Sequence, residues 1–386
     1  MNKIRFTDCV DIVGSSCGTF DGTKIYVSTG AVDTDHIEAA DIEIIDYNGR
    51  PSRANLIVKE NDIIFAKMQA TTKTLLINKE MSEYIYSTGF CAVKAKRNII
   101  TDKCLYYLLT SETFLTQKDK NCSGATQKAI TNTGLEKIEI CIPDIEKQEK
   151  LVKCLDLICN IISFRKQQLQ QLDKLVKARF VEMFGDPEHN EKKWDVLKLE
   201  ALCSVSSSKR IYQNELSVAG VPFLRISDLV NRMDTGSTEC ELHIPEERYE
   251  ELKTLGLVPT TGDVLLTARG TLGRCYIISE SDRFYFQDGM ITWLYDFDKS
   301  LTTNYLTHLF TMSGFRKQID SLQAGSTVAY LSIAMTKKLD VMLPPIELQN
   351  EFAAFVRQID KSKFAVQKAL DEAQTLFDSL MQEYFG

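Results

Sequence analysis

A long internal repeat restricts the fold of this chain more than any other feature. Residues 124–151 align without a gap to residues 325–352, at an offset of 201 residues. The same offset pairs Phe184-Gly185 with Phe385-Gly386. The sequence therefore predicts two tandem copies of one structural unit. Identical pairs at this offset are Gly124/Gly325, Thr126/Thr327, Lys137/Lys338, Pro143/Pro344, Ile145/Ile346, Glu146/Glu347 and Gln148/Gln349.

Upstream of this segment the two copies share a plan but few residues. VKENDIIFAKMQAT, from Val58, is similar to VPTTGDVLLTARGT, from Val258, and EYIYSTGFCAV, from Glu83, is similar to RFYFQDGMITWL, from Arg283. These runs are rich in Ile, Val, Phe and Tyr and are bounded by turn residues, which is typical of β-strands. Each copy is predicted to begin with a variable β-rich domain, covering residues 1–144 in the first copy and 186–343 in the second.

Each copy then continues into a seven-residue apolar pattern, which predicts one long helix at 145–185 and another at 344–386. A helix of about 40 residues is about 60 Å long, and one with a single apolar seam needs a partner. We expect the two helices to pair antiparallel as a coiled-coil spacer with pseudo-twofold symmetry. Packing of each helix on its own β-rich domain is the alternative. The predicted seam consists of Leu155, Ile158, Ile162, Leu169, Leu172, Val176, Val356, Ile359, Val366, Leu370, Phe377 and Leu380.

Charge and cysteine content limit the possible functions. The net charge of −7 argues against nucleic-acid binding by bulk attraction, unless basic groups gather on one face or a partner supplies phosphate contacts. The sequence has no signal peptide and no apolar run long enough for a membrane span, so we expect a soluble cytoplasmic protein that does not contact a membrane. None of the 11 cysteines forms a CxxC motif, which favours reduced core thiols.

The repeated junctions carry a family resemblance. GATQKAI...IEICIPDIEKQ and GSTVAYLS...LDVMLPPIELQ each lead from a glycine turn into a long helix, and MFGDP separates the copies. Over essentially the whole chain this arrangement resembles the specificity (S) subunit of type I restriction-modification systems. The resemblance implies an α+β fold with two target-recognition domains, each reading one half of a bipartite double-stranded DNA target. It also implies two methyltransferase (M) subunits docked on the helices, and restriction (R) subunits that join through the M–S complex.

Catalytic motifs are missing from the sequence. The Pro344-Pro345 pair lacks the flanking polar and aromatic residues of an adenine methyltransferase loop, and Gly270-Thr271-Leu272-Gly273 lacks the lysine of a phosphate-binding loop. We therefore expect no cofactor and no catalysis. The four histidines show no metal-ligand spacing, so we expect no metal. Acidic residues near Asp62 and Asp263, each with a basic residue downstream, fit a metal-dependent nuclease poorly.

Polar residues after the matching strands and in the glycine turns are the candidates for DNA contact. Arg and Lys can read guanine edges, Gln can read adenine, and Thr commonly contacts phosphate. A basic residue after a strand can equally be a solvated hairpin face, and we expect Gly124 and Gly325 to serve the turn itself. The candidates are Lys67, Gln69, Thr71, Thr72, Lys73, Thr126, Gln127, Lys128, Arg225, Arg269, Thr271, Arg274, Ser326 and Thr327.

Two further interpretations remain open at this level. The chain could be the DNA-recognition module of another methyltransferase-based defence system, or a coiled-coil scaffold that binds protein only. Salt-dependent DNA binding would separate the DNA-binding interpretations from the scaffold.

Overall fold

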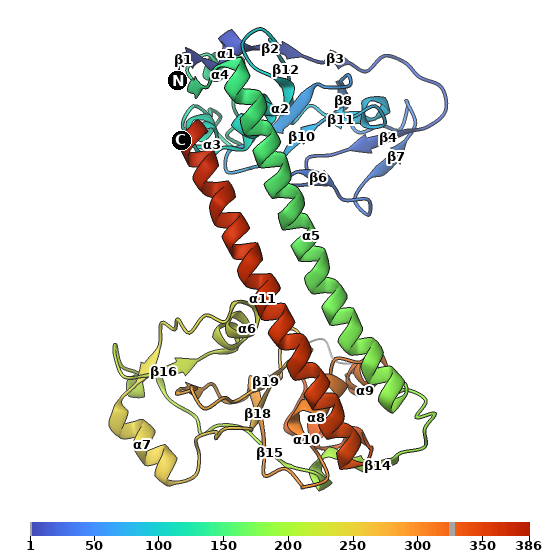
Figure 1. Cartoon of the computed structure of the whole chain (residues 1–386), viewed down its shortest axis with the longest axis vertical. Coiled ribbons are helices and arrows are strands. Elements are labelled where there is room, and N and C mark those ends of the chain that lie inside the picture. Colours follow the sequence, from blue (N-terminus) through green and yellow to red (C-terminus); the bar gives the residue numbers. More distant parts are fainter. Residues whose placement is uncertain (1, 324–328) are drawn as a thin grey trace. The chain divides into compact units, whose positions relative to one another are not determined.

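The chain forms two compact units in a computed structural model that describes residues 2–323 and 329–386. Unit 1 comprises Met1–Gln167 and Val366–Gly386, and unit 2 comprises Gln168–Ala365. Each unit therefore combines one β-rich part with segments of both long helices (Figure 1). No helix of the described residues is long and apolar enough to cross a membrane.

Unit 1 is built from many short strands followed by three short helices. Its strands are β1 (Asn2–Arg5), β2 (Val10–Val13), β3 (Ser15–Ser16), β4 (Lys24–Val27), β5 (Val32–Asp33), β6 (His36–Ile37), β7 (Glu43–Ile45), β8 (Ala54–Ile57), β9 (Ile63–Ala66), β10 (Thr74–Leu76), β11 (Ile85–Ser87), β12 (Phe90–Ala95) and β13 (Glu139–Ile142). Its helical elements are α1 (Phe6–Cys9), η1 (Met81–Glu83), α2 (Asp102–Thr110), α3 (Glu112–Lys120) and α4 (Asn132–Leu135).

Unit 2 follows the same order with fewer strands and two additional helices, α6 and α7. Its strands are β14 (Asp195–Lys198), β15 (Ser204–Ser206), β16 (Val221–Leu224), β17 (His243–Ile244), β18 (Val264–Thr267), β19 (Cys275–Ile277), β20 (Tyr285–Phe286), β21 (Ile291–Tyr295) and β22 (Asp340–Leu343). Its helical elements are η2 (Leu199–Ala201), η3 (Gln213–Glu215), α6 (Ile226–Thr235), α7 (Glu246–Thr254), α8 (Thr303–Leu309), α9 (Ser313–Leu322) and α10 (Ile333–Lys337). The long helices are α5 (Ile145–Phe184) and α11 (Ile346–Phe385).

A four-stranded antiparallel sheet is common to both units. Its strand order is β10-β9-β12-β2 in unit 1 and β19-β18-β21-β15 in unit 2. The pairs match at the repeat offset, since Val93 lies opposite Ile63 and Leu294 opposite Val264. This sheet is therefore the duplicated scaffold of the chain.

The central strand of this sheet is buried on both faces, which explains its unbroken apolar sequence. In β9, Ile63 and Phe65 belong to the core beneath the helices, whereas Ile64 belongs to the core shared with the second sheet. Val264 and Leu265 of β18 face opposite cores in the same way. A strand covered on both sides needs apolar residues at successive positions rather than in alternation.

The second sheet differs between the units. In unit 1 it has five strands in the order β3-β8-β11-β4-β7, and in unit 2 it has three in the order β17-β16-β20. Both keep one parallel pair, β4 with β11 and β16 with β20. The sequence variation between the copies thus coincides with a real difference in structure.

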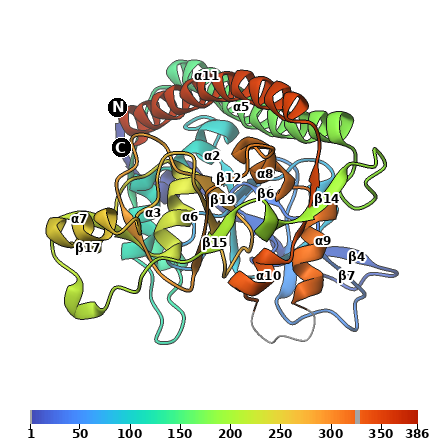
Figure 2. The ribbon, with the colours of Figure 1, turned by 90° about the horizontal axis from the view of Figure 1, so that it is seen from below.

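The two long helices run antiparallel. In unit 2, Arg179 of α5 pairs with Glu351 of α11 at 3.0 Å, and six residues earlier Asp173 pairs with Lys363 at 2.5 Å. The partner number rises as the α5 number falls, which requires opposite directions, and both views show this stretch of α5 beside α11 (Figures 1 and 2). The predicted seam residues are buried or half-buried along both helices.

The last turn of each long helix packs in the core of the unit that contains the β-rich part of the other repeat. Phe184, at the end of α5, is fully buried in unit 2, with its ring 4.8 Å from Tyr305 and 5.4 Å from Phe352. Its repeat partner Phe385, at the end of α11, is buried in the core of unit 1. The duplicated Phe-Gly pair therefore closes the core of one unit with a helix from the other repeat.

A buried glutamine fixes the start of each long helix. Gln148 donates from Nε2 to the carbonyls of Ile99 and Pro143 at 2.9 and 2.8 Å, and its Oε1 accepts from the Thr101 amide. Gln349 makes the equivalent bonds to Ser300, Pro344 and Thr302. These bonds satisfy backbone groups that burial would otherwise leave unpaired, which explains the repeated Gln in the junction motif.

Candidate nucleic-acid interface

The register of the duplicated sheet decides which residues after β9 correspond to which residues after β18. Ala66 ends β9 and Thr267 ends β18. The Ala66 amide donates to the Lys73 carbonyl, and the Thr267 amide donates to the Arg274 carbonyl, both at 2.9 Å. Ala66 and Thr267 therefore occupy the same position in the duplicated sheet. Lys67 therefore corresponds to Ala268, and Arg269 corresponds to Met68. The runs from Val58 and Val258, read without a gap, would pair Lys67 with Thr267, so the strand register shifts that comparison by one position and reverses the face on which the side chains lie.

In unit 1 the structure brings the two predicted groups of candidates together. The Gln69 amide donates to the Lys128 carbonyl at 3.0 Å, and the Ile130 amide donates to the Lys67 carbonyl at 2.9 Å. A β-bridge joins Met68 to Ala129. The turn after β9 and the glycine turn are thus one continuous surface, although 60 residues of sequence separate them.

The glycine turn needs its glycine for geometric reasons. Gly124 has φ +133°, and a Cβ there would lie 2.4 Å from the Gln127 carbonyl oxygen. The turn is closed by a bridge between Ser123 and Ala129, and Thr126, Gln127 and Lys128 are exposed on it. Gly124 therefore has a structural role, while its polar neighbours are free to contact a ligand.

Two lysines of this surface are held by backbone carbonyls. Lys67 Nζ donates to the Thr88 carbonyl at 3.0 Å, and Lys73 Nζ donates to the Thr29 carbonyl at 2.8 Å. Within the described part of the chain, no carboxylate pairs with Lys67, Lys73 or Lys128. Their positive charges are therefore available to an anion such as phosphate.

Sequence reasoning missed Arg53, which the fold adds to this surface. The Thr88 amide donates to the Arg53 carbonyl at 2.9 Å, so Arg53 lies beside the loop that holds Lys67, and it is exposed. The remaining candidates have different roles. Thr71 donates to the Met68 carbonyl at 2.7 Å and so shapes the turn, whereas Thr72 is exposed.

In unit 2 the equivalent surface centres on Arg269. Its guanidinium lies over the Tyr330 ring at 5.3 Å from the centroid, and a β-bridge joins the two residues. Thr271 is exposed, and its carbonyl accepts from Thr267 Oγ1 at 2.6 Å. The candidates Ser326 and Thr327, together with Gly325, lie outside the described residues.

The other two arginine candidates of unit 2 are paired with carboxylates. Arg274 makes a two-point contact with Asp234, at 3.2 and 2.5 Å, and this hydrogen bonding lowers the pKa of Asp234. Arg225 pairs with Asp228 and with Glu241 at 3.3 and 3.0 Å. These arginines must break or share an ion pair before they can contact DNA.

The two clusters considered for a nuclease have structural roles instead. Asp62 is buried and accepts from the Lys59 amide at 2.8 Å, and Asp263 accepts from the Thr260 amide at 2.7 Å and from Trp293 Nε1 at 2.9 Å. Burial raises the pKa of Asp263. Both carboxylates cap a turn before the central strand, and Asp263 also lines a pocket of about 690 Å³ in unit 2.

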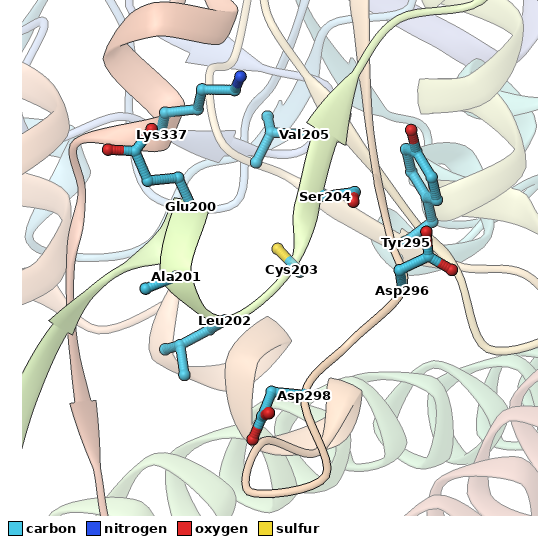
Figure 3. A pocket seen from close by; sticks show the side chains of 10 residues that line it. All are labelled: Glu200, Ala201, Leu202, Cys203, Ser204, Val205, Tyr295, Asp296, Asp298 and Lys337. Carbon is cyan, nitrogen blue, oxygen red and sulfur yellow. The ribbon is translucent and has the colours of Figure 1, made fainter.

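Two acidic features accompany these surfaces, and one of them, the β5–β6 hairpin, accepts from the Thr74 amide through the Thr34 carbonyl at 2.7 Å, next to Lys73. A pocket of about 520 Å³ in unit 2 is lined by Glu200, Asp296, Asp298 and Lys337 among others, and its acidic lining does not suit phosphate (Figure 3). In unit 1 the β5–β6 hairpin brings exposed Asp33, His36 and Glu38 ligand atoms within 4.8 Å of one another, which the sequence spacing did not suggest. Hydrogen bonds from the His36 ring nitrogens to the Asp35 and Glu38 carboxylates raise the pKa of His36.

Comparison with known proteins identifies the family. The model of the type I restriction modification DNA specificity domain matches residues 12–174 and 191–373, one match per repeat. The chain belongs to this family.

The individual relatives are distant but consistent. The chain is 25% identical to a putative type I restriction enzyme specificity subunit of Haemophilus influenzae, over 68% of this chain and 65% of that protein. It is 24% identical to the MjaVIII specificity subunit of Methanocaldococcus jannaschii, over 83% of this chain and 79% of that one. The aligned part thus spans just under two thirds of the Haemophilus protein.

Solved structures share the fold. A chain from a study of type I restriction-modification complex assembly superposes with a TM-score of 0.59 at 18% identity, covering 99% of this chain and 97% of that one. The type I S subunit from M. genitalium superposes with a TM-score of 0.58 at 14% identity, covering 100% and 96%. These likenesses confirm the α+β fold with two tandem domains and a pair of long helices.

Proposed function

We propose that this chain is the specificity subunit of a type I restriction-modification complex and that each unit reads one half of a bipartite double-stranded DNA target. The observation that carries the proposal is the repeated surface beside the central strand. The turn after that strand is bridged to Ala129 in unit 1 and to Tyr330 in unit 2, and the exposed side chains there differ. A constant scaffold with different polar side chains is suited to recognising two different sequences.

Charge distribution on this surface supports DNA as the ligand. Lys67, Lys73, Lys128 and Arg53 gather in unit 1 although the chain has a net charge of −7. The local basic surface meets the objection that an acidic protein binds nucleic acid poorly. The chain has no catalytic role in this proposal, because the residues on the surface are contact groups and the buried carboxylates are turn caps.

The long helices provide a surface suited to methyltransferase subunits. On the part of α5 in unit 1, Leu157, Ile161 and Phe164 are 61%, 40% and 63% exposed, and their spacing places them on one face. Leu175 and its repeat partner Leu376 are 47% and 51% exposed, one in each unit. Leu175 and Leu376 recur at the repeat offset and so offer one apolar site to each of two methyltransferase subunits, with restriction subunits joining through that complex. The repeat partners of Leu157, Ile161 and Phe164 are Gln358, Ser362 and Ala365, so that apolar face belongs to α5 alone.

Methylome sequencing tests the proposal. Cells that carry the methyltransferase subunit should show a bipartite methylated motif only when this chain is also expressed. A methyltransferase that modifies the same motif without the chain would contradict the proposal.

The exposed apolar face of α5 is tested by complex assembly. Phe164→Glu should remove the methyltransferase from the purified complex, whereas Leu255→Glu, the control at an exposed position of unit 2, should not.

A further inference from the structure

A buried lysine holds the recognition turn of unit 1. The Lys118 side chain, in the last turn of α3, is only 1% exposed. Its Nζ donates to the carbonyls of Thr71 and Met68 at 2.7 and 3.1 Å and lies 3.4 Å from Thr71 Oγ1. An ammonium group has three protons, so these three acceptors satisfy it. Burial lowers the pKa of Lys118, and the adjacent Asp119 opposes this effect.

Asp119 holds the same turn through the backbone amide of Ala70. Its Oδ2 accepts from the Ala70 amide at 3.0 Å. Ala70 has φ +57°, a left-handed conformation that residues with a side chain rarely adopt without support. Two successive residues of α3 therefore fix both the carbonyls and the amide of residues 68–71, while Gln69 and Thr72 remain exposed.

Unit 2 closes the equivalent turn without a lysine. The residue at the position of Lys118 is Ile319, which is fully buried in the apolar core. There Gly270 and Gly273 supply positive φ values of 69° and 72°. The turn carbonyls accept from Thr267 Oγ1 and from Arg316 Nη2, at 2.6 and 3.0 Å. The scaffold thus accepts an apolar side chain at this position, so the lysine is not required to complete the core.

We propose that Lys118, together with Asp119, is a positioning residue for sequence recognition by unit 1. Burying an ammonium group has a desolvation cost that an apolar side chain at the same position does not have. Here that charge fixes one conformation of a turn whose glycine-free sequence does not favour it. The inference rests on the function proposed above. By fixing the backbone of the turn, Lys118 and Asp119 set the direction in which the exposed side chains around it point.

The test uses Lys118→Met in the full chain assembled with its methyltransferase, because methionine is unbranched and fills a similar volume. Binding is measured for the native target and for targets with either half randomised, and amide hydrogen exchange is followed at residues 68–72. The variant should lose about tenfold of its discrimination in the half read by unit 1, keep the other half, and exchange faster at Ala70. Ile319→Met is the matched control in unit 2 and should leave both halves unchanged.

A second variant keeps the test decisive if Lys118→Met does not fold. Asp119→Ala removes the acceptor of the Ala70 amide from a side chain that is 31% exposed, and it should relax the same half of the target. Equal losses in both halves, or native discrimination in a folded variant whose turn exchanges faster, would overturn the inference. Absence of any bipartite preference in the unmodified chain would instead contradict the proposed function.

Discussion

The candidate surfaces of unit 1 and unit 2 share the same strand register, but their basic side chains have different partners. In unit 1, Lys67 and Lys73 rest on backbone carbonyls and pair with no described carboxylate. In unit 2, Arg274, at the position of Lys73, is paired with Asp234, and Arg225 is paired with two acidic residues. The same scaffold therefore presents ammonium groups without a carboxylate partner in one unit and guanidinium groups paired with carboxylates in the other.

If each unit reads one half of a DNA target as proposed, this difference predicts how each half is bound. A lysine ammonium acts as a point charge that suits phosphate, whereas a guanidinium held in one orientation suits the edge of a base. Arg269 lies over the Tyr330 ring and has no carboxylate partner among the described residues, so its guanidinium donors are available to a base. We expect unit 1 to contribute more of the salt-dependent affinity and unit 2 to depend more on direct readout.

The largest expected effect concerns the shared scaffold. Phe184→Ala and Phe385→Ala each empty a buried site and should each cost about 3–5 kcal/mol of folding free energy. Denaturant unfolding with hydrogen exchange should place the loss in unit 2 for Phe184→Ala and in unit 1 for Phe385→Ala. Phe164→Ala, at a 63% exposed position, is the control and should be nearly neutral. Loss in the same unit for both variants would break the equivalence of the two units.

The buried glutamines at the starts of the long helices, Gln148 and Gln349, should contribute equally to folding stability. Gln148→Leu leaves the Ile99 and Pro143 carbonyls and the Thr101 amide without their partner, which should cost about 2–3 kcal/mol. Gln349→Leu should cost a similar amount, measured as the change in unfolding free energy. If one substitution is tolerated and the other is not, the helix starts are not equivalent.

The exposed cations should differ in what they recognise. Arg269→Ala should weaken binding by about 1–3 kcal/mol and relax base preference in one half of the target. Lys67→Ala should weaken binding to all sequences to a similar degree. Affinities for a panel of singly substituted targets will distinguish the two, and a sequence-specific loss from Lys67→Ala would place base readout in unit 1 as well.

The smallest expected effect concerns the salt dependence of binding, which tests whether the ion pair between Arg274 and Asp234 persists on DNA. Lys73→Ala should lower the slope of log affinity against log salt by about 1, because an available charge is lost. Arg274→Ala, at the equivalent position, should change the slope less, since Asp234 already neutralises that side chain. The slopes of both variants are measured on the native target. Equal changes would show that the ion pair with Asp234 opens on binding.

Features that depend on local pattern were predictable from the sequence. The heptad period predicted helices at 145–185 and 344–386, and the structure has them at Ile145–Phe184 and Ile346–Phe385. The offset of 201 residues holds through the central sheet, because a buried strand tolerates few insertions. The family resemblance and the fold are confirmed by the comparisons.

Features that depend on distant contacts were not predictable. The sequence does not show that Phe184 enters the core of the other unit, nor that Asp234 pairs with a residue 40 positions away. Lys118 looks like an ordinary surface lysine in α3, and only the fold buries it against Thr71. Arg53 joins the basic surface through a backbone bond that leaves no signal in the sequence. The run from Val58 reaches Asp62 one residue sooner than the run from Val258 reaches Asp263, so the two runs cannot be paired residue by residue without the strand register.

The central claim is that each unit reads its own half of the target, and a domain exchange tests it most directly. Residues 1–144 would be replaced by the matching part of another specificity subunit, with the long helices kept so that Phe385 still closes unit 1. The methylated motif of cells carrying the hybrid is then determined by sequencing. We expect one half of the motif to change while the other half remains as in the parent. A motif in which both halves change, or neither does, would contradict it.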